Sequence, residues 1–421
     1  MKQGASDAPE SAVDARRLAE DVARRGYGKL IAFLAASTGN VTQAEDALSD
    51  AFASALKDWP LNGCPSNPEG WLLTVARRKI IDAARRRRSG EAASPQLQLL
   101  AEEASAGAAD TEIPDHRLAM MFACAHPAIE ASVRAPLMLQ TVLGLTAQTI
   151  ASAFLTSPAA MGRRLVRAKE KIRQAAIPFS IPEHEELPGR LNAVLDAVYA
   201  AFAEGWTEPG GADTARRDLA EEALFLARLA VTLLPDEPEA LGLLALMLYA
   251  DARRGARRDA EGEYVPLAAQ DRTLWDWQMI AEAEALLQRA SAMGSIGRFQ
   301  LEAALQSAHV YRCRTGEANW AEMVQLYDAL FALSASPVVA INRALAIAEL
   351  HNAATGLGAM PELAGDTRLA EYQPYWAARA ELLAKAGEIE EAGRAYEIAI
   401  GLEQDPAVRR FLQRRLSALA D

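Results

Sequence analysis

Apolar residues recur along most of the chain at intervals of three and four residues, and no alternating stretch is long enough for a strand. This period places apolar side chains on one face of a helix. We expect helices over residues 14–37, from Thr42 to about Trp59, and from Pro68 into an arginine run that ends at Arg88. Beyond Pro188 only amphipathic segments of helix length follow. The pattern therefore predicts an all-α fold.

The ends of the first three helices carry recognisable signals. Thr38-Gly39-Asn40 contains the residue types that end a helix in a left-handed conformation. Thr42 is followed three residues later by Glu45, which predicts a capping box at the start of the second helix. Asn67 precedes Pro68, and proline is favoured at the first helical position because its missing N–H costs nothing there. These signals predict two short connections between three helices.

Composition divides the chain into three domains and a linker, which suits a length of 421 residues. Residues 89–114 mix Ala, Ser, Gly and Glu without periodicity and predict a flexible linker. A proline-punctuated segment, "IPFSIPEHEELP", forms a second boundary. We therefore expect domains over residues 10–88, 115–178 and 186–421.

The last domain contains a repeat-like pattern. In residues 375–406, large and small apolar residues occupy the positions typical of a tetratricopeptide unit of about 34 residues, in which two antiparallel helices pack closely. These residues are Trp376, Ala380, Leu383, Ala392, Tyr396 and Ala399. The segment from Trp320 to Leu350 resembles a degenerate preceding unit. We expect a domain of tetratricopeptide-like helical hairpins.

Charge is distributed unevenly. The chain has a formal net charge of −12, with +3 over residues 1–180 and −15 over residues 181–421. The longest apolar run, Ala240 to Ala250, is shorter than the roughly 20 residues that span a bilayer, so we expect no membrane association. Cys64, Cys124 and Cys313 lie far apart, which favours a reducing cytoplasm.

No pattern in the sequence indicates a catalytic or metal site. Cys124-Ala125-His126 has two potential zinc ligands and no second pair to complete a tetrahedral site. A phosphate-binding loop and a nucleophile–base pair are also missing from the sequence. We therefore expect a protein that is not an enzyme, with no cofactor and no metal.

A basic helix follows the second predicted loop. Leu72, Ala76, Ile80 and Ala83 define a buried stripe, and residues 77–88 hold seven Lys or Arg with one acid. Such a concentration of positive charge is typical of a surface that neutralises phosphates. The alternative is a solvated helix end whose arginines complement the helix dipole.

A second basic helix completes a helix-turn-helix pattern over residues 145–173. Thr146 is expected to cap its first helix, and Ser157-Pro158 begins the second. The second helix has an inner apolar stripe of Met161, Leu165, Ala168 and Ile172, with an outer face of Arg163, Arg164, Arg167 and Lys171. This arrangement is typical of a helix that enters the major groove of DNA. Helical hairpins of this size also occur as packing units.

Together these segments resemble the extracytoplasmic-function sigma factors of bacterial RNA polymerase. "AEDALSDAFASALKDW" resembles the helix of sigma region 2 that binds core polymerase, and "PEGWLLTVARRKIIDAARRRR" resembles the helix that reads and opens the promoter −10 element. Residues 145–173 resemble the −35 reader of region 4. Segments such as "LLPDEPEALGLLALMLYADARR" and "SPVVAINRALAIAE" resemble the subgroup with a tetratricopeptide-like C-terminal extension.

The resemblance implies roles for particular residues. In region 2, Glu45, Asp46 and Asp50 would contact the β′ clamp helices, and region 4 would bind the β flap. The −10 contacts would come from the loop 61–67, with Asn62 and Asn67, and from the basic helix, with Arg77, Arg78, Lys79, Arg85 and Arg86. The −35 contacts would come from Arg163, Arg164, Arg167 and Lys171.

The resemblance also implies partners: core RNA polymerase and promoter DNA, in the cytoplasm. A small YCII-like protein is a further candidate partner. The acidic extension is also expected to dock on the basic half of the chain or on polymerase. Two other classes stay open. One is a helix-turn-helix regulator that never contacts polymerase, and the other is a tetratricopeptide scaffold whose basic half is incidental.

Overall fold

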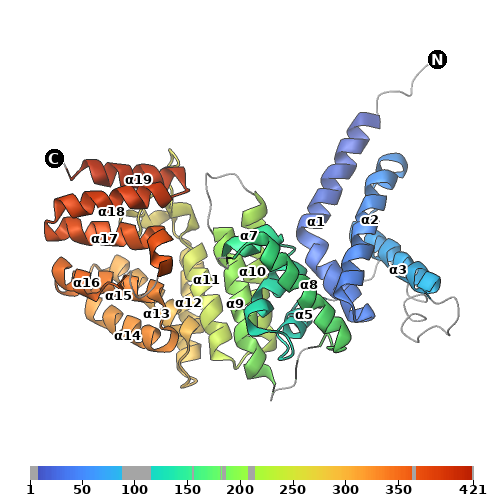
Figure 1. Ribbon diagram of the computed structural model, residues 1–421, viewed down its shortest axis with the longest axis horizontal. Coiled ribbons are helices and arrows are strands. Elements are labelled where there is room, and N and C mark those ends of the chain that lie inside the picture. Colours follow the sequence, from blue (N-terminus) through green and yellow to red (C-terminus); the bar gives the residue numbers. More distant parts are fainter. Residues whose placement is uncertain are drawn as a thin grey trace. The chain divides into compact units, whose positions relative to one another are not determined.

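The computed structural model describes residues 8–87, 115–153, 156–180, 182, 186–206, 214–362 and 367–419. Within these ranges the regular elements are all helical, apart from one isolated β-bridge between Arg258 and Tyr264 (Figure 1). The prediction of an all-α fold is confirmed. The expected linker over residues 89–114 lies outside the described residues.

Three long helices begin the chain: α1 (Ala8–Thr38), α2 (Val41–Asn62) and α3 (Pro68–Arg87). Gly39 ends α1 with a φ of 66°, as its sequence signal predicts. The capping box predicted at Thr42 is wrong, because Asn40 is the N-cap of α2 and its side chain accepts a hydrogen bond from the backbone N–H of Gln43. An N-cap asparagine satisfies one of the free N–H groups of the first turn. The carboxylate of Glu45 is thereby left available for another partner.

The start of α3 agrees with its prediction. The side chain of Asn67 accepts a hydrogen bond of 2.9 Å from the backbone N–H of Gly70, and Pro68 is the first helical residue. Leu72, Ala76 and Ile80 are buried, whereas Ala83 is half-buried. The predicted apolar stripe therefore attaches α3 to the helices beneath it.

Four shorter helices follow: α5 (Arg117–Cys124), α6 (Ala131–Thr141), α7 (Ala147–Ala153) and α8 (Pro158–Gln174). Thr146 Oγ1 accepts a hydrogen bond from the N–H of Thr149 at the start of α7, and Ser157 caps α8 through the N–H of Ala160. The four predicted inner residues of α8, Met161, Leu165, Ala168 and Ile172, are all buried. Helices α7 and α8 therefore lie where the sequence predicts the two helices, and the helix-turn-helix itself stays a prediction.

Packing divides the chain into two compact units. The N-terminal unit comprises Met1–Gly205 with Ala215–Leu226, and the C-terminal unit comprises Trp206–Thr214 with Ala227–Asp421. Helix α9 (Leu187–Trp206) and the first part of α10 (Thr214–Leu233) therefore belong with the N-terminal helices. The domain bounds expected from the sequence, 10–88, 115–178 and 186–421, stay a prediction.

Contacts of one arginine join the first half of α10 to the helices of the N-terminal unit. Arg117 on α5 is 7% exposed, forms ion pairs with Asp115 and with Glu222 of α10, and places its guanidinium 4.9 Å from the ring centre of Phe225. A nearly buried charge is stable only when it is paired. Arg117 therefore needs the first half of α10 beside it.

The C-terminal unit is a series of helical hairpins. It contains α11 (Pro238–Asp251), α12 (Trp277–Ser291), α13 (Arg298–Thr315), α14 (Trp320–Ser334), α15 (Pro337–Leu350), α16 (Ala353–Ala359), α17 (Gln373–Ala386), α18 (Ile389–Leu402) and α19 (Pro406–Ser417), with short 3₁₀ turns at Arg254–Ala256, Leu267–Ala269, Arg272–Leu274 and Thr367–Glu371. Helices α17, α18 and α19 lie side by side (Figure 1).

The cores of these hairpins explain the apolar patterns of the sequence. In α11 the residues from Ala240 to Tyr249 are all buried, which accounts for the longest apolar run. Gly242 of this helix lies so close to α13 that an added Cβ would be 2.7 Å from the backbone nitrogen of Gln300. Five of the six predicted repeat positions lie in one core cluster, to which Ala395 of α18 and Leu412 of α19 also belong: Ala380, Leu383, Ala392, Tyr396 and Ala399. The sixth, Trp376, packs against this cluster.

Candidate nucleic-acid interface

The exposed cations of α3 are fewer than the sequence suggests. Arg78 and Lys79 are exposed, but Arg77 is only 6% exposed and lies 5.0 Å from the ring centre of Phe33 on α1. Arg77 therefore departs from the expectation of a surface cation, because a guanidinium stacked on an aromatic face is held in the packing between helices. Arg85 and Arg86 belong to the helix, and their side chains lie outside the described residues.

The connection between α2 and α3 presents polar groups next to these cations. Asn62 is exposed and donates a hydrogen bond of 2.7 Å from Nδ2 to Asp58. Leu61 is 83% exposed. Asn67 is half-buried and uses its side-chain oxygen to cap α3, so its first role is structural.

The acidic residues predicted on α2 do not share one environment. Asp46 and Asp50 are exposed, and Asp50 lies 4.0 Å from the Nζ of Lys79. Glu45 instead accepts two hydrogen bonds from Nζ of Lys169 on α8, at 2.6 and 2.8 Å. Both side chains are largely withdrawn from water, with 11% of Lys169 and 21% of Glu45 exposed. The structure therefore joins a predicted polymerase-binding residue to the predicted −35 helix.

The burial around this pair affects a neighbouring phenol. Burial raises the pKa of Tyr27 to about 12, and the negative charges of Glu45 and Asp46 act in the same direction. Tyr27 therefore stays protonated at neutral pH. The pattern of the sequence contained no signal for the contact between Lys169 and Glu45, because Lys169 is only one cation among several on α8.

A close backbone contact lies in the same region. An added Cβ on Gly28 of α1 would lie 1.7 Å from the carbonyl oxygen of Val142, directly after α6. Only glycine allows this approach without movement of the backbone. Tyr27 also packs against the turn that contains Gly144, whose φ is 68°. Helix α1 and the α6–α7 connection are thus fitted closely to each other.

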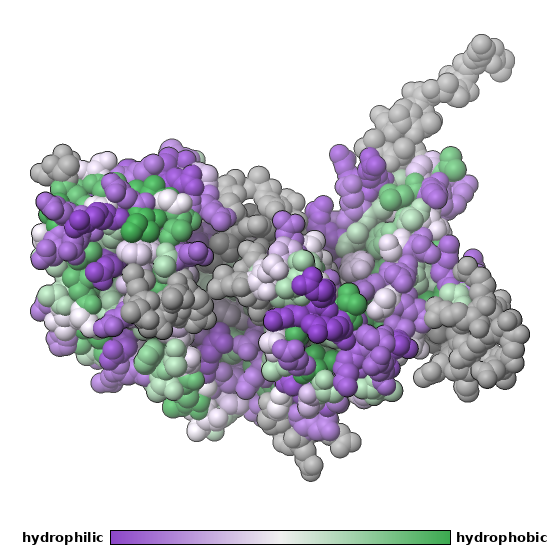
Figure 2. Space-filling model, viewed as in Figure 1, coloured by the Kyte–Doolittle hydropathy of each residue, from purple (hydrophilic) through white to green (hydrophobic). Residues whose placement is uncertain are grey.

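The outer face of α8 carries the positive charge predicted for a −35 reader. Arg163, Arg167 and Lys171 are exposed and Arg164 is half-buried. Strongly hydrophilic residues gather over α8 in Figure 2. Arg164, Arg167 and Lys171 also line a small cavity of about 180 Å³ together with Glu130 and four apolar residues, Ala128, Ile129, Val133 and Ala168.

The Cys-Ala-His segment has a structural environment. The Cys124 thiol is buried 3.6 Å from the hydroxyl of Thr141, and burial raises the pKa of this thiol to about 12. His126 accepts a hydrogen bond through Nδ1 from the N–H of Ala128. A protonated thiol is a poor metal ligand. The described residues contain no group of three or more His, Cys, Asp or Glu that could hold a metal ion.

In the described part of the chain, no helix is both long enough and apolar enough to span a bilayer.

Comparison with known proteins agrees with this arrangement of helices. Residues 22–90, which contain most of α1 and all of α2 and α3, match sigma-70 region 2. Residues 190–291 match a family of unknown function (DUF6596). The protein thus has sigma-70 region 2 at its N-terminus, which implies binding to core RNA polymerase and promoter DNA and a non-enzymatic role in transcription initiation.

The chain is also 38% identical over 387 residues to an uncharacterized protein of Rhizobium meliloti (strain 1021), and the alignment covers 90% of this chain and 91% of that protein. The chain belongs to the same family as that protein. No solved structure matches it.

Proposed function

We propose that the protein is a sigma factor of the extracytoplasmic-function type, which binds core RNA polymerase and directs initiation at specific promoters. The observation that carries this proposal is the match of residues 22–90 to sigma-70 region 2, since it covers both the acidic helix α2 and the basic helix α3. The helix-turn-helix of α7 and α8 supplies the second DNA reader that such a factor needs.

Polymerase binding is assigned to Glu45, Asp46 and Asp50 on α2, which would contact the β′ clamp helices. The pair with Lys169 means that Glu45 must change partners when polymerase binds. The free protein therefore holds part of its polymerase-binding surface against its own −35 helix. Separation of α8 from α2 is then a step of activation.

Promoter opening is assigned to the α2–α3 connection and α3. Opening DNA costs roughly a few kcal/mol for each base that is unstacked, and a loop pocket beside cations offsets this cost. Asn62 in the loop and the exposed Arg78 and Lys79 are the described residues that fit this role, with Arg85 and Arg86 farther along the helix. We assign Arg77 to the α1–α3 packing.

Promoter recognition at −35 is assigned to Arg163, Arg164, Arg167 and Lys171 on the outer face of α8, with region 4 bound to the β flap. An arginine that contacts a guanine with two hydrogen bonds discriminates by about 1–3 kcal/mol. The four cations occupy a different side of α8 from its apolar inner stripe, so they can face the major groove while the stripe stays buried.

Run-off transcription with purified core enzyme tests the proposal. The full chain is expected to start transcripts at defined sites, and R78A/K79A is expected to lower the yield. K57A is the matched control, because Lys57 is an exposed lysine of α2 outside the proposed DNA surface. Each lost phosphate contact should also reduce the salt dependence of promoter binding by a log–log slope of about 0.9. Transcripts that start at no defined site would refute the sigma function.

The same purified protein distinguishes a sigma factor from the alternative, a helix-turn-helix regulator that does not contact polymerase. A sigma factor co-purifies with core polymerase, whereas a one-component regulator binds DNA and leaves polymerase unbound. Binding of a promoter fragment without any binding of core enzyme would favour the regulator.

We assign a regulatory role to the C-terminal unit, through polymerase, through the basic half of the chain or through a small YCII-like protein. A truncation that removes the C-terminal unit should retain α9 and all of α10, because Arg117 depends on Glu222 and Phe225 of α10. Deletion of residues 234–421 is therefore the informative truncation. Unchanged transcription in cells after this deletion would contradict a regulatory role.

A further inference from the structure

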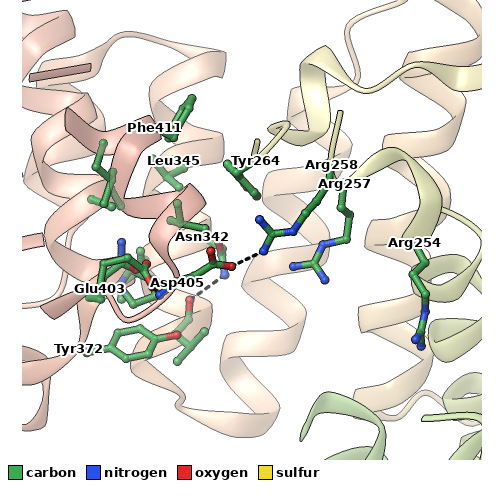
Figure 3. A pocket seen from close by; sticks show the side chains of 18 residues that line it. Arg254, Arg257, Arg258, Tyr264, Asn342, Leu345, Tyr372, Glu403, Asp405 and Phe411 are labelled. Carbon is green, nitrogen blue, oxygen red and sulfur yellow. Dashed lines mark hydrogen bonds and ion pairs between the residues drawn. The ribbon is translucent and has the colours of Figure 1, made fainter. Parts of the chain in front are cut away.

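The C-terminal unit contains a cavity of about 570 Å³ (Figure 3). One wall is the segment from Arg254 to Tyr264, and the other walls are formed by helices α15, α17 and α19. The volume of the cavity lies within the range of roughly 300–1,000 Å³ that is typical of sites for small molecules. The cavity is therefore large enough to hold a ligand between these segments.

Contacts between residues far apart in the sequence hold the first wall in place. Glu263 pairs with Arg410 at 2.5 Å and with Arg414 at 2.9 Å, both on α19. Tyr264 meets Phe411 of the same helix edge to face, with ring centres 5.4 Å apart. Because this wall is already fixed, little conformational entropy is lost when a ligand enters the cavity.

Each arginine of the lining has a partner. Arg254 pairs with Asp251 at 2.7 Å, and Arg258 pairs with Asp405 across the cavity wall. Arg257 also interacts with a neighbouring group. The positive charge of the lining is therefore compensated by the protein itself, and an anionic ligand would have to compete with contacts that already exist.

The two carboxylates of the lining are occupied as well. Asp405 pairs with Arg258 and also accepts a hydrogen bond of 2.9 Å from the N–H of Ala407, as the N-cap of α19. Glu403 accepts hydrogen bonds of 2.8 Å from the N–H groups of Gln404 and Asp405. A charged ligand would lose its hydration here without gaining a new ion pair, which is unfavourable. The lining therefore favours a ligand without charge.

Apolar side chains from two helices form a second part of the lining. Helices α15 and α19 supply Val338, Ile341, Leu345, Val408, Phe411 and Leu412. Val338 is 41% exposed in spite of its apolar side chain. Removal of such surface from water is favourable. The body of the ligand is therefore expected to be apolar.

Two phenol groups remain for neutral polar contacts. Tyr264 and Tyr372 line the cavity, and neither hydroxyl has a hydrogen-bond partner among the described residues. Burial raises the pKa of both tyrosines, so both hydroxyls stay protonated and can donate. In the view of Figure 3, Tyr264 lies above the pair of Arg258 with Asp405, and Tyr372 lies below it. The ligand can therefore carry a neutral acceptor, such as a carbonyl oxygen.

We propose that this cavity binds an uncharged, mainly apolar small molecule, with its apolar body against α15 and α19 and a neutral oxygen within reach of Tyr264 or Tyr372. The proposal is independent of the assigned roles of the N-terminal unit, because all of these residues belong to the C-terminal unit. Such a site makes the C-terminal unit a receptor for an uncharged apolar compound.

Fluorescence titration of the full-length chain with N-phenyl-1-naphthylamine tests the proposal. This dye is uncharged, and its emission rises when it leaves water for apolar surroundings. The matched probe is 8-anilinonaphthalene-1-sulfonate, which has the same ring system with an added sulfonate. The uncharged dye is expected to bind with one-to-one stoichiometry, and the sulfonate is expected to bind at least about tenfold more weakly, because its charge gains no partner.

Three variants locate the site. V338D places a carboxylate in the lining at the second residue of α15, where the helix dipole favours an acid, and should weaken binding of the uncharged dye by about tenfold or more. N342W places a large side chain in the cavity from an exposed position of α15 and should abolish binding. I389D is the matched control, because Ile389 is an exposed apolar residue at the start of α18 outside the lining, and it should alter affinity by no more than about twofold.

Displacement of the dye tests the two phenols. The ketone 2-acetylnaphthalene is compared with 2-ethylnaphthalene, which has a similar shape and no oxygen. Y264F/Y372F keeps both rings and should weaken the ketone by about three- to tenfold, as expected for a lost hydrogen bond, while the hydrocarbon changes by no more than about twofold. An unchanged affinity for the ketone would overturn the contact with the phenols.

Circular dichroism before each titration shows that the variants are folded, and V338D provides the decisive reading if N342W is unstable. The proposal is overturned if the uncharged dye does not bind saturably, if the sulfonate binds as tightly, or if V338D binds the uncharged dye like the wild type.

Discussion

The ion pair between Lys169 and Glu45 joins α8 to α2 in the free protein, and its removal tests whether this contact limits the binding of polymerase. The variant K169M keeps the length and apolar stem of the side chain and removes its charge. Glu45 is then left 21% exposed without its cation. A carboxylate in that position gains hydration when α8 separates from α2, so the variant should favour the separated form.

The magnitude follows from the geometry. Two unit charges about 4 Å apart attract by about 4 kcal/mol at an effective dielectric constant of 20, and the cost of desolvation offsets much of this. The two short hydrogen bonds to Nζ then leave a net coupling of about 1–3 kcal/mol. Since each 1.4 kcal/mol is a factor of about ten, K169M should bind core polymerase about tenfold more tightly than the wild type.

Fluorescence anisotropy of the labelled protein against core polymerase, without DNA, measures this affinity. K171M is the matched control, because Lys171 is an exposed lysine of the same helix and loses the same charge. E45Q should weaken core binding, since the proposed contact loses its negative charge. A double-mutant cycle of E45Q and K169M in urea unfolding measures the coupling itself. Equal core affinity of K169M, K171M and the wild type would refute the reasoning.

Two further predictions concern stability. G28A should lower the free energy of unfolding by about 1–3 kcal/mol, because the added Cβ would meet the carbonyl oxygen of Val142. G162A is the control, because its added Cβ meets nothing within 4 Å. Equal stability of G28A and the wild type in urea would contradict the close contact. Burial, with Arg312 beside it, lowers the pKa of His309 from 6.5 to about 4. The unfolded state therefore binds more protons between these values, and stability should fall as pH drops from about 6.5 to about 4, by at most about 3 kcal/mol. H309Q should flatten this slope in urea titrations, and an unchanged slope would contradict the assignment.

Local signals predicted local structure well. The inner residues Met161, Leu165, Ala168 and Ile172 are buried as their spacing indicates, because a period of 3.6 residues is a property of the helix itself. Asn67 caps α3 for a similar reason, since its partner lies only three residues away. At the start of α2 the pattern indicated Thr42, whereas the structure uses Asn40, which the sequence analysis had placed in the signal that ends the preceding helix. A local signal does not decide a helix start to the residue.

The sequence identified two basic helices and an acidic helix. Seven of the predicted site residues are exposed, and their binding roles stay predictions: Asp46, Asp50, Arg78, Lys79, Arg163, Arg167 and Lys171. Arg77 could not be distinguished from its neighbours by type, yet its position on α3 turns it toward Phe33. The sequence also contained no sign that Lys169 would face Glu45.

The sequence by itself determined the helices, their apolar faces, the uneven charge and the resemblance to sigma region 2, because each of these depends on residue types at short and regular spacings. Only the tertiary structure decided which helices share a unit, which acid Lys169 holds, and that three arginines from residues 254–258 face apolar side chains from residues 338–412 across one cavity. Contacts between residues more than a hundred positions apart depend on how whole helices pack, and no local pattern of side chains encodes that packing.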